Sequence, residues 1–196
     1  MPIWPQTLIE ENVTPGAVYG LTTVKASTCP VQLVSSTYTV VDGEFRVYAI
    51  YLPKAATLTG VGWLQTTAGD TTQDNNNKIG LFNSDGTNLV RVAQSTDDGT
   101  LWEGAAGTKQ KAFSATYSAA PGVYWIGMLA NWSAVATAPV IGAASQVTGN
   151  VHSGLPGLPA NHMLSCALAA QTDLPSSTAW TGMGTVSGRV PYLFVY

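Results

Sequence analysis

The sequence predicts an all-β protein, folded as a two-sheet antiparallel β-sandwich of the jelly-roll type with an N-terminal arm. Three observations support this prediction. Charged residues make up only 10% of the 196 residues, and long helical bundles need more Glu, Lys and Arg on their exposed faces. Apolar and polar residues alternate with the period of a β-strand in several short segments. Turn-forming residues, among them 20 Gly and 11 Pro, separate these segments.

The N-terminal stretch differs from the rest of the chain. Apart from residues 17–24 and 31–34, the first 36 residues show little alternation. We therefore expect residues 1–36 to form an arm that attaches the protein by adding a strand. The strand would join either the body of the chain, residues 37–196, or a neighbouring molecule. Residues 37–196 are expected to form the β-sandwich domain. Thr7 and Glu10 have the spacing of a capping box, which predicts one short helical turn.

In the first half of the body, strands are expected at residues 44–52 and 58–64. Residues 44–52 begin with alternation and then become apolar on both faces, which indicates a strand that passes from an edge into a covered part of a sheet. Residues 78–82 and 89–93 are two short β-prone runs. The turn between them contains Asp85 followed by Gly86, so the pair predicts a β-hairpin.

In the second half, residues 111–117 alternate and lead through a Pro-Gly turn into residues 123–130, which are apolar on both faces. A turn-bounded, aromatic-rich run of this length predicts a central buried strand rather than a helix. Further strands are expected at residues 164–169 and 190–196. The segment 133–162 is rich in Ala, Gly and Pro, and we expect it to be a long loop that is functional or packed against a partner.

Composition argues against several classes of protein. The formal net charge is −3, and the eight basic residues are scattered, so no nucleic-acid partner is expected. No apolar run approaches the ~20 residues of a membrane-spanning helix, so no membrane insertion is expected. No basic stretch followed by an apolar one opens the sequence, so no secretory signal is expected. Hydrophobic residues reach 45%, which argues against disorder.

The sequence contains no recognisable catalytic or cofactor-binding motif. No Gly-rich phosphate loop follows a predicted strand, and no nucleophile elbow of the Gly-x-Ser-x-Gly type occurs. We therefore predict that the protein is not an enzyme and has no catalytic residues, no cofactor and no metal. A glycosidase would need two carboxylic acids, which lie far apart in sequence, and nothing marks any two of the 11 acidic residues as such a pair.

The chain has two histidines and two cysteines that could serve as metal ligands. A zinc site of His152, His162 and Cys166, with Cys29 as a fourth ligand, is chemically conceivable but lacks the closely spaced ligand pairs of most zinc sites. Two solvated histidines and a buried thiol are the simpler interpretation. Both cysteines are expected to be reduced and buried. Calcium could bind at Asp97 and Asp98 or at residues 70–74, although an Asp-Asp-Gly sequence is more often a turn.

The tryptophans are the strongest candidates for a binding surface. Trp63 and Trp125 lie inside predicted strands and are expected in the core. Trp102 and Trp132 lie at predicted loop positions, where an exposed ring could stack on a sugar or anchor a protein interface. The alternative is that both rings cap the ends of the sandwich core. The two glycosylation sequons, at Asn12 and Asn131, are expected to be chance occurrences.

Several of these segments resemble a β-sandwich domain that is common in bacteriophage virion proteins. The likeness begins at residues 57–63 and continues through the hairpin, where Gly80, Leu81 and Phe82 are followed by Asp85 and Gly86. Residues 111–127 resemble the strands that follow in that family, and residues 174–193 resemble its closing strand. The resemblance covers about residues 37–196 and leaves the first 36 residues outside.

The resemblance implies a non-enzymatic structural component of a phage virion, assembled in the host cytoplasm. Such proteins are typically homo-oligomers, often homotrimers, that also contact other virion proteins. We expect a tail-associated role, as a minor tail or fibre protein that could bind a receptor; a capsid decoration or cement protein is the alternative within this class. A carbohydrate-binding module that recognises a host-surface glycan is the alternative of another class, and a hydrolase is the third.

Overall fold

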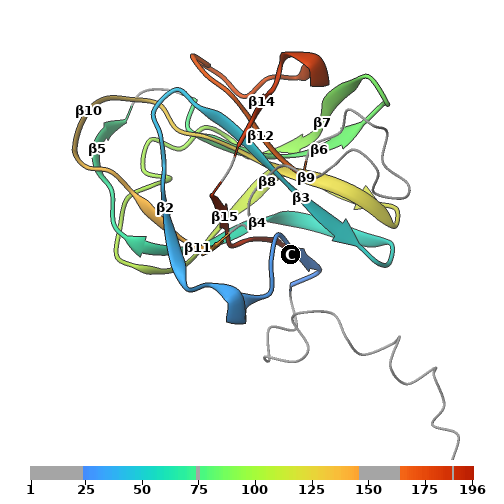
Figure 1. Cartoon of the computed structure of the whole chain (residues 1–196), viewed down its shortest axis with the longest axis horizontal. Coiled ribbons are helices and arrows are strands. Elements are labelled where there is room, and N and C mark those ends of the chain that lie inside the picture. Colours follow the sequence, from blue (N-terminus) through green and yellow to red (C-terminus); the bar gives the residue numbers. More distant parts are fainter. Residues whose placement is uncertain (1–23, 74–75, 146–163, 187) are drawn as a thin grey trace, which may run out of the picture.

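The computed structural model describes residues 24–73, 76–145, 164–186 and 188–196. Within these ranges the regular elements are β-strands and two short 3-10 turns, η2 (Val31–Leu33) and η3 (Trp180–Gly182), with no α-helix (Figure 1). The predicted all-β class is confirmed. The helical turn expected at Thr7 to Glu10 lies outside the described residues.

Eight strands form the two facing sheets, and every pair among them is antiparallel. The first sheet contains, in spatial order, β1 (Ala26–Ser27), β16 (Leu193–Val195), β4 (Ala56–Thr67) and β8 (Gly107–Ala119). The second contains, in spatial order, β7 (Asn88–Gln94), β6 (Lys78–Ser84), β9 (Gly122–Leu129) and β3 (Phe45–Leu52).

The order of these strands is that of a jelly roll. Counted along the chain, the first sheet holds the first, eighth, third and sixth of the eight strands, and the second sheet holds the fifth, fourth, seventh and second. The first strand thus pairs with the last, and each sheet takes strands from both halves of the chain. Two interleaved Greek keys give this arrangement. The predicted two-sheet antiparallel sandwich is therefore what the chain forms.

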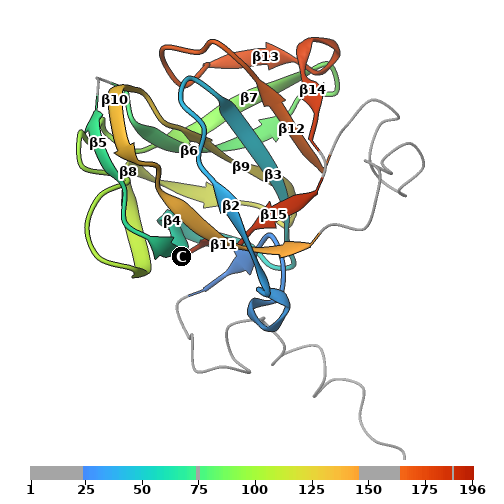
Figure 2. The ribbon, with the colours of Figure 1, turned by 60° about the vertical axis from the view of Figure 1, so that its left-hand side comes forward.

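Smaller strands extend the sheets at their margins. The first sheet gains β2 (Ser36–Thr39), β11 (Val140–Ser145) and β15 (Arg189–Pro191). The second sheet gains β12 (Ser165–Leu168) and β14 (Gly184–Thr185) beside β3, and β13 (Ser177–Ala179) beside β7. A separate two-stranded ribbon, β5 (Asp70–Gln73) with β10 (Trp132–Thr137), lies at the left of both views (Figures 1 and 2).

Both faces of the second sheet are covered. One face packs against the first sheet to form the main core, which includes Leu58, Trp63 and Ile126. The other face is covered by the segment that follows β12, whose Leu174, Trp180 and Met183 join Trp125 in a second apolar cluster. This double covering explains why residues 123–130 are apolar on both faces, as expected of a central strand.

The predicted boundary at residue 36 falls inside packed structure. Val24 and Ala26 are buried, and β1 pairs with β16, so residues 24–36 belong to the sandwich and supply its first strand. The Thr28 hydroxyl also donates a hydrogen bond to the Pro191 carbonyl at 2.6 Å. A two-residue strand is too short to show alternation, which is why the sequence does not reveal it. Residues 1–23 lie outside the described residues.

The prediction of a long loop at residues 133–162 is wrong for the first part of that segment, which contains β10 and β11. After Trp132, every residue of β10 is exposed, whereas β11 is buried from Ile141 to Ala144. Neither strand therefore alternates. The rest of that segment, residues 146–163, lies outside the described residues. The strand expected at 190–196 is divided into β15 and β16 at Tyr192.

Candidate functional site

Trp102 is part of the core and does not form an exposed binding surface. Its ring is 1% exposed and lies 5.4 Å, centroid to centroid, from the ring of Trp63. Its carbonyl accepts hydrogen bonds from the Gln65 Nε2 and the Gly69 N–H, each at 3.1 Å. The loop that contains Trp102 folds back over the end of the sandwich. The expectation that this ring could stack on a sugar is therefore corrected, and the core-capping alternative holds.

Trp132 is half-buried against the main core at the start of β10. Its backbone N–H donates a hydrogen bond to the Asp42 carboxylate at 2.9 Å. The preceding residue, Asn131, is 8% exposed. The Asn77 side chain donates a hydrogen bond to the Asn131 carbonyl at 2.9 Å and accepts one from the Asn131 backbone N–H at 2.8 Å, which fixes the backbone next to Trp132. The Asn131 side chain donates a hydrogen bond to the Asn76 carbonyl at 3.2 Å, so the sequon has no accessible side chain. Trp132 keeps an exposed part, but the structure does not bring it to a shared surface with Trp102.

The other sequence candidates do not form one cluster. His152 and His162 lie outside the described residues, and among the described residues no three His, Cys, Asp or Glu side chains gather in a way that could hold a metal ion. The Asp98 carboxylate pairs with Lys111 at 2.8 Å, and its hydrogen bond with Lys111 lowers its pKa. Asp97 accepts a hydrogen bond from the Asn77 N–H at 2.8 Å. Both carboxylates thus already have protein donors.

The two cysteines are free, but only Cys166 is buried, whereas Cys29 is half-buried. Burial raises the pKa of the Cys166 thiol to about 12 and also raises the pKa of Cys29. Because the thiolate is the reactive form, we expect Cys29 to react with iodoacetamide at least about tenfold faster than Cys166 in the native protein. Mass spectrometry of digested samples would measure both rates, with a urea-unfolded sample as the control. Equal native rates would contradict the described burial of Cys166.

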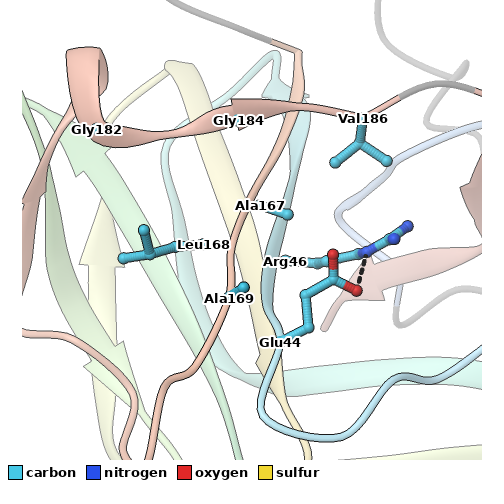
Figure 3. Close-up of a pocket in the computed structure, with 8 residues that line it drawn as sticks. All are labelled: Glu44, Arg46, Ala167, Leu168, Ala169, Gly182, Gly184 and Val186. Carbon is cyan, nitrogen blue, oxygen red and sulfur yellow. Dashed lines mark ion pairs between the residues drawn. The ribbon is translucent and has the colours of Figure 1, made fainter.

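A pocket of about 500 Å³ lies where β3, β12 and β14 meet at one margin of the second sheet (Figure 3). Ala167 of β12 is paired directly with Arg46 of β3, which places the two side chains on one face of the sheet. The opposite wall comes from β14 and its flanks. The lining residues are Glu44, Arg46, Ala167, Leu168, Ala169, Gly182, Gly184 and Val186.

Arg46 is held in a fixed position in this pocket. Its Nε lies 2.7 Å from Glu44 Oε2, and its guanidinium carbon lies 4.7 Å from the centre of the Tyr38 ring. Its Nη1 also donates a long hydrogen bond, of 3.5 Å, to the Tyr48 hydroxyl. Burial is the largest single influence on the pKa of Arg46 and acts to lower it, but Glu44, Tyr38 and Tyr48 together outweigh burial, so the net shift is upward. Burial raises the pKa of Tyr48 to about 12, so Tyr48 is a neutral hydroxyl.

The pocket therefore offers one acceptor and one donor side by side. The structure gives Glu44 Oε1 and Arg46 Nη2 no partner among the described residues. The other lining residues are apolar, and three of them, Ala167, Ala169 and Val186, lie around the charged pair (Figure 3). The sequence showed Glu44 and Arg46 only as polar positions of an alternating strand. Nothing in it joined them to residues more than a hundred positions later.

A second notable surface is the outer side of β8. Along this strand the outward residues are exposed and uncharged: Thr108, Gln110, Ala112, Ser114, Thr116 and Ser118. We call this set the β8 face. The side chains of Phe113, Tyr117 and Ala119 point the other way, into or against the main core.

The comparisons with known proteins add no relative: no protein-family model matches the chain, and no curated protein matches it. Among the described residues, no helix has the length and apolar character that a membrane span requires.

Proposed function

We propose that this chain is a non-enzymatic structural component of a bacteriophage virion, associated with the tail, that assembles with copies of itself and with other virion proteins. The β8 face is the observation on which this proposal depends. The jelly-roll order of the strands is compatible with it, since capsid and lectin domains share that order. The sequence resemblance to virion sandwich domains points in the same direction.

The β8 face lies at a margin of the first sheet. On one side β8 pairs with β4, and on the other the described residues supply an isolated bridge from Ser95 to Phe113 and a hydrogen bond from the Ser114 hydroxyl to the Gln94 carbonyl. Long exposed edge strands in monomers are usually protected by charged side chains or Pro. The outward residues of β8 contain neither. The two lysines of this 13-residue strand, Lys109 and Lys111, lie at the inward positions, so the β8 face itself is uncharged and is a favourable surface for association.

A second copy of the chain is the occupant that best matches this face. Burying the hydroxyl and amide groups of Thr108, Gln110 and Thr116 costs little if each finds a hydrogen-bond partner across the contact, and a like face supplies such partners. A strongly charged partner would lose hydration there without an opposite charge to compensate. We therefore expect a homo-oligomer, and a trimer is the state that the resemblance implies.

Sedimentation velocity at micromolar concentration tests this self-association. The double substitution Gln110→Glu and Thr116→Glu places like charges on the β8 face of every copy. We expect it to weaken association by at least about tenfold, because charges at a contact are costly to bury and repel each other. Ser176→Glu with Thr181→Glu, two exposed positions that follow β12, makes the same charge change and should have no effect.

A parent protein that sediments as a 20.5 kDa monomer would contradict the proposed self-assembly. The position in a particle is tested separately, by immunogold labelling of phage: label on tails supports the tail role, and label spread over heads would replace it with the decoration role. A deletion that tests attachment must end at Thr23, because Val24 and Ala26 are buried in the sandwich.

A further inference from the structure

We propose that the pocket between β3, β12 and β14 binds a single neutral saccharide ring, such as a hexose unit of a glycan. This inference does not depend on the proposed virion role, and it uses neither Trp102 nor Trp132. It rests on the arrangement of Glu44 and Arg46, on the neutral charge of that pair, and on the small apolar residues beside it.

The polar groups of the pocket match two neighbouring hydroxyls of a sugar. A sugar hydroxyl donates one hydrogen bond and accepts others, so adjacent hydroxyls are recognised by an acceptor and a donor placed side by side. The Glu44 carboxylate and the Arg46 guanidinium are such neighbouring groups, since the 2.7 Å contact between Oε2 and Nε holds them next to each other. Hydrogen bonds to charged groups are the stronger ones.

The charge of the site favours a neutral ligand. Glu44 and Arg46 together have no net charge, and they are the only ionisable residues that line the described pocket. A phosphate or carboxylate would meet the repulsion of Glu44 beside the attraction of Arg46, whereas a neutral hydroxylated ring meets neither. The Tyr38 ring covers one face of the guanidinium, which further limits approach by an anion.

The apolar residues suit the carbon face of the ring. Ala167, Ala169 and Val186 present methyl groups, and they lie around the charged pair in Figure 3. At Gly182 a Cβ would meet no atom within 4 Å, so the lining there is open space. The volume of about 500 Å³ lies in the range of small-molecule pockets and exceeds what one ring needs, which leaves room for a glycan to continue outward.

Nuclear magnetic resonance on the ¹⁵N-labelled full chain tests this site. Neutral hexoses and N-acetylhexosamines are titrated to tens of millimolar, since a single ring is expected to bind with a dissociation constant of about a millimolar. We expect saturable shifts of the amide signals of Arg46, Ala167, Ala169 and Gly184. Uronic acids, which have the same ring with a carboxylate, are expected to bind more weakly.

Two variants and a matched control give the residue-level result. Glu44→Gln removes the charged acceptor with little change of shape, and Ala169→Leu fills the pocket from an exposed position. Each is expected to weaken binding by at least about fivefold. Ala106→Leu adds the same bulk at an exposed position outside both the pocket and the β8 face and should leave binding unchanged. Spectra of the free variants show whether each is folded.

Saturable shifts at the pocket that both variants weaken support the proposal. Tighter binding of an oligosaccharide than of its free monosaccharide identifies a glycan as the source of the ring. The proposal is overturned if no neutral sugar shifts these signals, if both folded variants bind as the parent does, or if uronic acids bind more tightly than neutral sugars. None of these outcomes bears on self-association through the β8 face.

Discussion

Replacement of Trp102 by Ala is expected to lower the free energy of unfolding by about 3–5 kcal/mol, the usual cost of truncating a buried Trp. The ring is 1% exposed and packs at 5.4 Å from Trp63, so its removal leaves a cavity at the end of the main core. Trp102→Phe is expected to cost less, because it refills part of that space and removes an indole N–H that has no hydrogen-bond partner among the described residues. Urea denaturation followed by far-ultraviolet circular dichroism measures both changes.

Trp132→Ala is the matched control, since it removes the same side chain from a half-buried site. Its expected loss is smaller, because part of this ring already contacts water. If Trp102→Ala proved as stable as the parent, the ring would not be packed as described. The comparison also matters for binding assays, since any loss of binding in Trp102→Ala would follow from a destabilised fold.

The sequence predicted those strands whose signal is local. The β6–β7 hairpin is marked by Asp85 and Gly86, where Gly86 has a φ of 96° and the Asp85 carboxylate accepts hydrogen bonds from two following backbone N–H groups. The strand at 123–130 is marked by its length and its apolar residues on both faces. The short strand β1, the exposed strand β10 and the buried strand β11 show no alternation of apolar and polar residues. They form because they pair with strands distant in the sequence, and a local pattern does not reveal such pairing.

The candidate site was less predictable than the fold. The pocket combines Glu44 and Arg46 with Ala167 and Gly184, and only the pairing of β3 with β12 and of β12 with β14 brings them together. Small residues have no sequence signature of binding. Trp102, in contrast, suggested a binding surface that the structure does not have. Its loop position predicted an exposed ring, but the loop covers the end of the core.

Replacement of Trp180 by Ala is expected to have a comparably large effect, a loss of about 3–5 kcal/mol in the free energy of unfolding. Trp180 is 0% exposed and contacts Trp125 edge-on at 5.0 Å between ring centroids. Its Nε1 donates a hydrogen bond to the Ser84 hydroxyl at 3.1 Å. It is thus the main anchor that holds the segment after β12 on the outer face of the second sheet.

This anchor also supports one wall of the pocket. Trp180 begins η3, which leads directly into β14, and β14 is paired with β12 through only Cys166 with Thr185 and Ala167 with Gly184. Two residue pairs are too few to hold a strand in place without the packing of Trp180 beside them. Loss of the ring should therefore free β14 before the central strands open.

Hydrogen exchange measured by mass spectrometry distinguishes this local release from a uniform loss of stability. In Trp180→Ala we expect faster exchange across residues 176–186 than across β9, and weaker sugar binding if the pocket binds a saccharide ring. Thr181→Ala, at the exposed neighbouring position, should change neither exchange nor stability. Equal acceleration in β9 and in residues 176–186 would show that the covering segment and the sandwich unfold as one unit, and would contradict a separate anchoring role for Trp180.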